Sequence, residues 1–242
     1  MPEFLGVLTQ DQIEKIHGSA LHVLHETGVR VESEALLRIL GDFGGEPDLD
    51  AQRIRFAPAW VEQLIADSDK YDWSAHKLSF GCSVGIYQGL YLNPDTDVLE
   101  PFAEKTLQDY IRVGNALPEV GSVGLLGLPF VPDWVPAAYT PLAEKLYAWK
   151  FGAHPYATVQ FTGLCPYIEE IYARYAEETG RPLNEVFGAS GFLLSPLRLA
   201  RSECEQLLYF HSRGLHMSVG HMLSLGLSTP VTTAGAAVLK LA

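Results

Sequence analysis

After Pro101 the chain alternates four times between short apolar segments and amphipathic segments of helical length. The apolar segments run continuously, which is typical of strands in a sheet buried on both faces. The expected strands are 120–126, 157–161, 186–194 and 215–219, and the expected helices are 136–151, 166–179, 200–213 and 229–242. A spacing of about 30 residues per unit fits parallel βαβ units. We therefore expect an α/β protein with the first four units of a (β/α)8 TIM-type barrel.

Chain order alone leaves a doubly wound open sheet as an alternative. Such sheets bind phosphates through a GxGxxG or P-loop motif after a strand, and no expected strand is followed by either motif. Residues 239–242 fall inside a helical pattern that has no stop signal. We expect from this that the barrel is truncated, with a frayed terminal helix as the alternative.

The first hundred residues have a different organisation. Thr9 and Gln12 form a capping-box pattern at the start of a helix that Gly28 closes. Three further elements are expected from periodicity and from Pro58, namely a helix at 33–42, a strand around 54–56 and a helix from residue 58.

A strong turn signal occupies residues 93–97, with the sequence Asn-Pro-Asp-Thr-Asp. We expect residues 78–99 to form short antiparallel strands around it. The chain is thus predicted to consist of a small α+β cap at residues 1–100 and the truncated barrel at residues 101–242.

Composition excludes several classes of protein. The net charge of −12 repels phosphate backbones, so no nucleic-acid partner is expected. No 18-residue run is free of charged and turn residues, and the first eleven residues lack the pattern of a signal peptide, so we expect neither membrane insertion nor secretion. Three scattered cysteines without a CxxC pair predict a reduced, cytoplasmic protein with no cysteine metal site.

Five segments carry a further pattern. They are Ile16-His17-x-x-Ala20-Leu21-x-x-Leu24 leading into 26–31, Arg53-Ile54-Arg55-Phe56-x-Pro58-x-x-Val61, Ala116-Leu117-Pro118, Ser195-Pro196-Leu197, and Met222-x-x-x-Gly226-x-Ser228-Thr229-Pro230-Val231-Thr232-x-Ala234-Gly235. In this order they resemble the trimethylamine methyltransferase family, and the last segment is the most specific. The resemblance spans nearly the whole chain, whereas family members are roughly twice as long, which implies the N-terminal half of an eight-unit barrel.

The resemblance implies an enzyme that moves a methyl group from trimethylamine or a betaine, such as glycine betaine, to the cobalt of a corrinoid (cobalamin) on a partner protein. Some members use pyrrolysine on a later strand, beyond Ala242, so the catalytic residue of this protein stays unknown. No residue of this chain supplies the nucleophile, and the chain alone is expected to be inactive. One alternative is a demethylase of the same barrel without pyrrolysine. The other is a non-catalytic protein that binds amines or betaines.

Ligands of barrel enzymes contact residues that follow the C-terminal ends of the strands. Aromatic faces hold methylated ammonium groups, so Phe130, Trp134 and Phe161 are predicted to bind substrate, with core packing as the alternative for each. Gln160 is expected to donate to a ligand oxygen or to cap a loop. His221 is expected to orient the substrate or to face the corrinoid, with a structural histidine as the alternative. No metal site and no cofactor held by this chain are predicted.

The predicted half-barrel leaves two strand edges and one apolar face uncovered. Such edges pair with other chains, and such faces become interfaces. We therefore expect a homo-oligomer.

Overall fold

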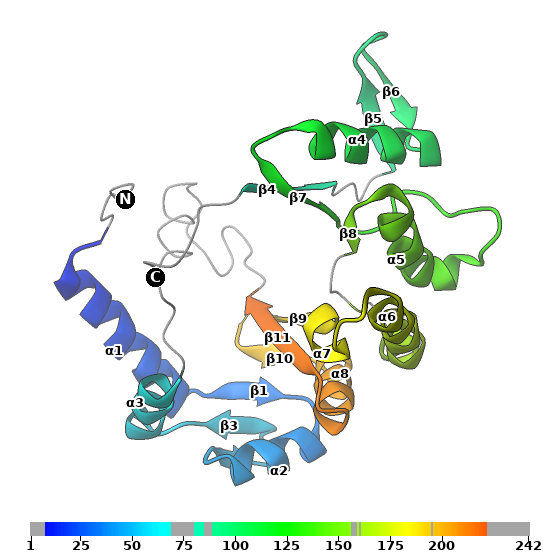
Figure 1. Ribbon diagram of the computed structural model, residues 1–242. Coiled ribbons are helices and arrows are strands. Elements are labelled where there is room, and N and C mark those ends of the chain that lie inside the picture. Colours follow the sequence, from blue (N-terminus) through cyan, green and yellow to red (C-terminus); the bar gives the residue numbers. More distant parts are fainter. Residues whose placement is uncertain are drawn as a thin grey trace. The chain divides into compact units, whose positions relative to one another are not determined.

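The computed structural model describes residues 8–68, 80–84, 89–155, 159, 161–194 and 196–221, with the backbone alone at His221. The chain divides into two compact units (Figure 1). One unit contains residues 72–189, and the other combines residues 1–71 with residues 190–242. Both mix helices and strands, and parallel strand pairs occur in each.

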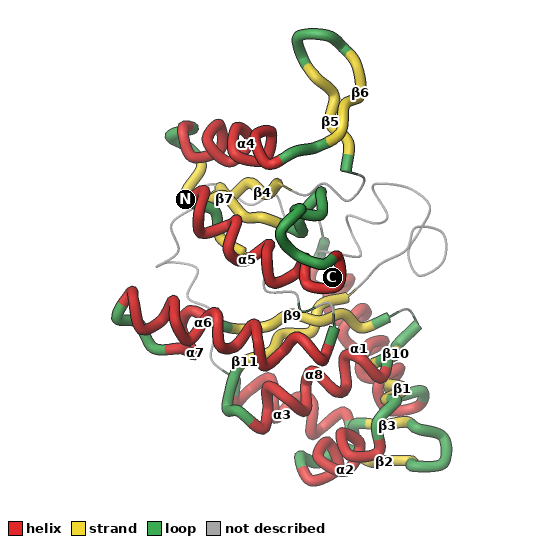
Figure 2. The backbone as a smooth tube through the Cα atoms, turned by 90° about the vertical axis from the view of Figure 1, so that its right-hand side faces the viewer, coloured by secondary structure: helices red, strands yellow, loops and turns green. Residues whose placement is uncertain are grey.

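The unit of residues 72–189 is built on a three-stranded parallel sheet in the order β4-β7-β8. Its strands are β4 (Phe80–Val84), β7 (Val120–Leu125) and β8 (His154–Pro155). The connection from β4 to β7 contains helix α4 (Glu104–Ala116), and the connection from β7 to β8 contains helix α5 (Thr140–Phe151). Parallel strands need crossovers of this length, and both helices pack against β7 (Figure 2).

The expectation that residues 78–99 form only antiparallel strands is wrong for β4, which pairs in parallel with β7. The hairpin around residues 93–97 is confirmed, since β5 (Leu90–Asn93) and β6 (Val98–Pro101) pair antiparallel. In its turn Asn93 accepts a hydrogen bond from the backbone N–H of Asp95. The turn could be predicted because its signal is local. The pairing of β4 could not, because it depends on a partner strand about 40 residues away in the chain.

The core of this unit lies between α4, the sheet and α5. Its buried apolar residues are Val84, Phe102, Leu107, Ile111, Val123, Leu125, Ala143, Tyr147, Ala148 and Ala153. Gly114 allows α4 to approach the sheet, because a Cβ there would lie 2.7 Å from Val123 and 2.9 Å from the sulfur of Cys82. Burial of this apolar surface holds α4 and α5 at fixed positions on β7.

Two further helices follow β8 within the same unit. They are α6 (Cys165–Thr179), which is preceded by the short η2 (Thr162–Leu164), and the one-turn α7 (Leu183–Val186). Gly180 ends α6 with φ +66°, as a helix C-terminus often requires. Helix α6 packs against α5, so α5 lies between α4 and α6.

The other unit contains a four-stranded sheet in the order β10-β1-β3-β2. Its strands are β1 (Val29–Val31), β2 (Glu46–Asp48), β3 (Arg53–Arg55) and β10 (Arg198–Leu199). Helix α2 (Glu34–Asp42) and helix α8 (Arg201–Ser212) contribute to the core around Val31 and Ile54. The parallel pairing of β1 with β10 joins the start of the chain to a segment about 170 residues later.

The expected N-terminal signals are confirmed. Thr9 and Gln12 form a reciprocal capping box at the start of α1 (Gln10–Glu26). Ser33, expected as the first residue of the next helix, is the N-cap of α2, which begins at Glu34. Pro58 occupies the first turn of α3 (Pro58–Asp67). Helix α1 buries none of its residues and contacts α3, to which His17 is joined by a 2.8 Å contact with Glu62. Among the described residues no helix is long and apolar enough to cross a membrane.

The four expected barrel strands have different outcomes. Strand β7 matches the first, and β9 (Gly188–Leu193) matches the third, although α7 takes the place of its first residue. Strand β11 (His216–His221) matches the fourth and pairs with β9. Residues 154–155 form β8, just before the second expected strand. Most of that expected strand lies outside the described residues, and so does the helix expected at 229–242. The described strands form no closed barrel.

Candidate functional site: an aromatic cluster around Tyr147

The loop after β7 brings two of the predicted binding residues to one ring. Phe130 lies edge-on to Tyr147 with ring centroids 5.6 Å apart, and Trp134 lies 6.2 Å from the same ring. The indole Nε1 of Trp134 donates a hydrogen bond of 3.2 Å to Tyr147 Oη. Phe130 is half-buried against the core, whereas Trp134 is 62% exposed. Trp134 therefore retains aromatic surface that a ligand can contact.

Helix α5 fixes the position of Tyr147. Pro141 stands in its first turn, and the helix turns Ala143, Tyr147 and Ala148 into the core. Only 4% of Tyr147 is exposed. Phe151 follows one turn later on the same side of the helix, with its ring 5.7 Å from that of Tyr147.

Two charged residues complete the group. The Nζ of Lys150 lies 5.4 Å from the centroid of the Tyr147 ring and 5.0 Å from that of Phe151. Lys150 also donates a 2.7 Å hydrogen bond to Glu104 Oε1, and the hydroxyl of Tyr147 donates a 2.8 Å bond to Glu104 Oε2. We call Glu104, Phe130, Trp134, Tyr147, Lys150 and Phe151 the Tyr147 cluster.

Hydrogen bonds and burial shift the pKa values of Glu104, Lys150 and Tyr147 in the cluster. Hydrogen bonding from Lys150 and then from Tyr147 lowers the pKa of Glu104, while the bond to Glu104 raises the pKa of Lys150. Burial, with the Glu104 carboxylate nearby, raises the pKa of Tyr147. At neutral pH the cluster thus contains a carboxylate, an ammonium and a protonated phenol.

This arrangement is suited to holding organic cations. Ring faces attract an ammonium through their quadrupole, and a nearby carboxylate supplies the opposite charge. It offers no activated nucleophile. In the described part of the chain, no three His, Cys, Asp or Glu side chains are grouped to hold a metal ion.

The other predicted binding residues are not part of the cluster. Phe161 is 58% exposed and contacts no other aromatic ring of the described residues. Gln160 lies outside the described residues, and His221 is described only as the last residue of β11. The prediction that Phe161, Gln160 and His221 contact the substrate therefore stays a prediction.

Sequence reasoning did not single out Tyr147, Lys150, Phe151 or Glu104. The sequence does hold a signal for three of them. Positions 147, 150 and 151 are spaced i, i+3 and i+4, which predicts that they share one helix face. Glu104 had no comparable signal, since it lies 43 residues from its partner Tyr147.

Comparison of the chain with known proteins finds no family model and no curated protein that matches it.

Proposed function

We propose that the Tyr147 cluster binds the ammonium group of a methylated amine. The observation that carries this proposal is the position of Lys150, whose ammonium lies over the Tyr147 and Phe151 rings and is paired with Glu104. The protein's own side chain thus occupies the place that an amine ligand would take. An ammonium over such rings gains about 0.5–2 kcal/mol, depending on its exposure to water.

A methylated ammonium competes well for this place. It is larger and less strongly hydrated than the lysine ammonium, so it gives up less hydration when it contacts rings. Lys150 is mostly exposed and can swing into solvent, which leaves Glu104 as the counter-charge. Trp134 and Phe130 would then flank the methyl groups.

We further propose that the chain is part of a (β/α)8 barrel methyltransferase that passes the methyl group to a corrinoid on a partner protein. The methyl transfer rests on the resemblance of segments such as residues 222–235 to the trimethylamine methyltransferase family. Support for the barrel comes from β4, β7 and β8, which are parallel neighbours joined through helices α4 and α5. The Tyr147 cluster includes the loop after β7, where barrel enzymes place their ligands.

Amine binding is tested by calorimetric titration of the 242-residue chain with trimethylammonium. Trp134→Leu should weaken binding about threefold or more, because an aromatic face is lost. Tyr167→Leu is the matched control, since Tyr167 is an aromatic residue of similar exposure on α6, and it should leave the affinity unchanged. Equal affinities of wild type and Trp134→Leu would contradict the proposal.

Methyl transfer is tested separately, by mixing the chain with trimethylamine or glycine betaine and reduced cobalamin and following the absorbance of the cobalt. Because the chain alone is expected to be inactive, saturable binding without methylation of cobalamin is the expected result. Methylation of cobalamin would show that these 242 residues supply the catalytic group themselves. If trimethylammonium does not bind, both proposals are contradicted.

A further inference from the structure

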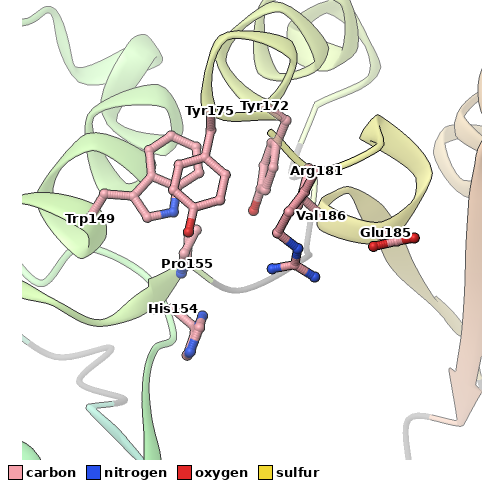
Figure 3. A pocket seen from close by; sticks show the side chains of 8 residues that line it. All are labelled: Trp149, His154, Pro155, Tyr172, Tyr175, Arg181, Glu185 and Val186. Atoms are coloured by element: carbon pink, nitrogen blue, oxygen red, sulfur yellow. The ribbon is translucent and has the colours of Figure 1, made fainter. Parts of the chain in front are cut away.

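A separate cavity of about 250 Å³ lies between α5, α6, α7 and the start of β8 (Figure 3). Trp149, Tyr172 and Tyr175 line it on one side, and Arg181, Glu185 and His154 line the rest. All belong to the unit of residues 72–189. The cavity is not part of the Tyr147 cluster, because Tyr147 and Trp149 are two positions apart and so point to nearly opposite sides of α5, about 200° around the helix.

The aromatic wall of this cavity is held in place by its own contacts. Trp149 and Tyr175 are stacked with centroids 4.5 Å apart and planes tilted by 3°, and Tyr172 meets Trp149 edge-on at 5.2 Å. Tyr172 is buried and stacks on Phe187 at 4.4 Å. These contacts fix the orientation of the aromatic wall, and the ring surface that they leave uncovered can contact a planar apolar group.

Two opposite charges face the same cavity without neutralising each other. Arg181 follows the end of α6, where its backbone N–H bonds to Ala176, and Glu185 lies on α7. Among the described residues neither side chain forms an ion pair. In Figure 3 the Arg181 guanidinium extends toward the space below Tyr172.

We propose that this cavity binds an aromatic α-amino acid as its zwitterion. The aromatic ring of the ligand would pack against Trp149, Tyr172 and Tyr175. Its carboxylate would accept the paired N–H groups of Arg181, the geometry that guanidinium groups match best, and its ammonium would face Glu185. A zwitterion is the complement of a cavity that has an aromatic wall, one cation and one anion.

The proposal is tested by calorimetric titration of the 242-residue chain with L-phenylalanine. Arg181→Met should weaken binding about tenfold or more, because it removes a charge-assisted pair, and Glu185→Gln should weaken it severalfold. The matched control is Arg174→Met, since Arg174 is also an exposed arginine, but it lies on α6 outside the cavity and is paired with Glu177. It should bind like the wild type.

Two analogues separate the contributions of the charges. Phenethylamine lacks the carboxylate and 3-phenylpropionate lacks the ammonium, so both should bind more weakly than phenylalanine. Phenethylamine affinity should not fall in Arg181→Met. Absence of saturable phenylalanine binding to the wild type, or equal losses in Arg181→Met and Arg174→Met, would overturn the proposal. Equal affinity for phenylalanine and 3-phenylpropionate, with no effect of Glu185→Gln, would overturn the zwitterion assignment.

Discussion

The indole of Trp134 donates a hydrogen bond to the hydroxyl of Tyr147, which in turn donates one to the carboxylate of Glu104. This chain of two bonds ties the loop after β7 to α5 and to the first turn of α4. The hydroxyl of Tyr147 is therefore the group on which the position of the loop depends.

Tyr147→Phe should lower the free energy of unfolding by about 1–2 kcal/mol, because both hydrogen bonds of a buried hydroxyl are lost. The fluorescence of Trp134 should shift as its loop loosens. Denaturant unfolding followed by fluorescence measures both effects. Tyr167→Phe, which changes an exposed tyrosine, should stay within about 0.5 kcal/mol of the wild type. Equal stabilities of the two variants would show that the hydroxyl does not hold the loop.

Substitution by alanine at two glycines near α1 should change the stability of the fold in opposite directions. Gly28 has φ +67°, and a Cβ there would lie 2.3 Å from the carbonyl oxygen of Ile54, so Gly28→Ala should cost more than about 1 kcal/mol of stability. Gly18 lies inside α1 with no atom within 4 Å of the added Cβ, so Gly18→Ala should stabilise by about 0.5–1 kcal/mol. Thermal unfolding of both variants tests the pair, and stabilisation by Gly28→Ala would contradict the described turn.

The cysteines should differ in reactivity. Burial raises the pKa of Cys165 and that of Cys204 to about 11, so neither forms much thiolate near neutral pH, while Cys82 is partly exposed. A thiol-reactive dye at about pH 8 should therefore label Cys82 first, and the other two only after unfolding. Mass spectrometry of peptides from the briefly labelled protein identifies the site. Early labelling of Cys165 would mean that α6 is not packed as described.

Glu144 and Lys145 form a buried ion pair on α5, with N–O 3.1 Å and exposed fractions of 4% and 1%. Lys145→Met should destabilise the fold by about 3 kcal/mol, because it removes the cation beside a buried carboxylate. Adding Glu144→Leu should recover much of this loss. Lys105→Met, which breaks an exposed pair with Asp109, should cost less than about 1 kcal/mol. If Lys145→Met cost as little as Lys105→Met in urea unfolding, the pair would not be buried in solution.

The buried Lys145 should also make the free energy of unfolding depend on pH. Burial lowers the pKa of Lys145, although Glu144 opposes this, so the folded chain binds the Lys145 proton less tightly than the unfolded chain does. As pH rises from the lowered pKa toward the ordinary value of 10.5, the unfolded chain binds more protons than the folded one and stability rises. Over this range the stability of wild type relative to Lys145→Met should increase in urea titrations. A decrease would mean that Glu144 outweighs burial.

The helix starts were predictable because their signals are local. Thr9 and Pro58 each act on backbone groups within a few residues, so the sequence shows the signal and its target together. The parallel pairings of β4 with β7 and of β1 with β10 were missed, because short strands carry no sign of a partner that is distant in the chain.

The candidate site was predicted in part for a similar reason. Phe130 and Trp134 follow an expected strand, and the rule that ligands meet the C-terminal ends of strands pointed to them. Tyr147 lies within a helix among buried residues, where an aromatic side chain usually indicates core packing. Its contacts with Trp134 and Glu104 arise only when the loop and two helices come together.

The most direct test of the ammonium site is the affinity of Lys150→Met for trimethylammonium, measured by calorimetry. Removing the internal ammonium frees the Tyr147 and Phe151 rings and the Glu104 carboxylate, so binding should tighten about fivefold. Lys105→Met makes the same change of charge on α4 away from the rings and should tighten binding much less. Equal affinities of the two variants, or weaker binding by Lys150→Met, would contradict the assignment of these rings as the ammonium site.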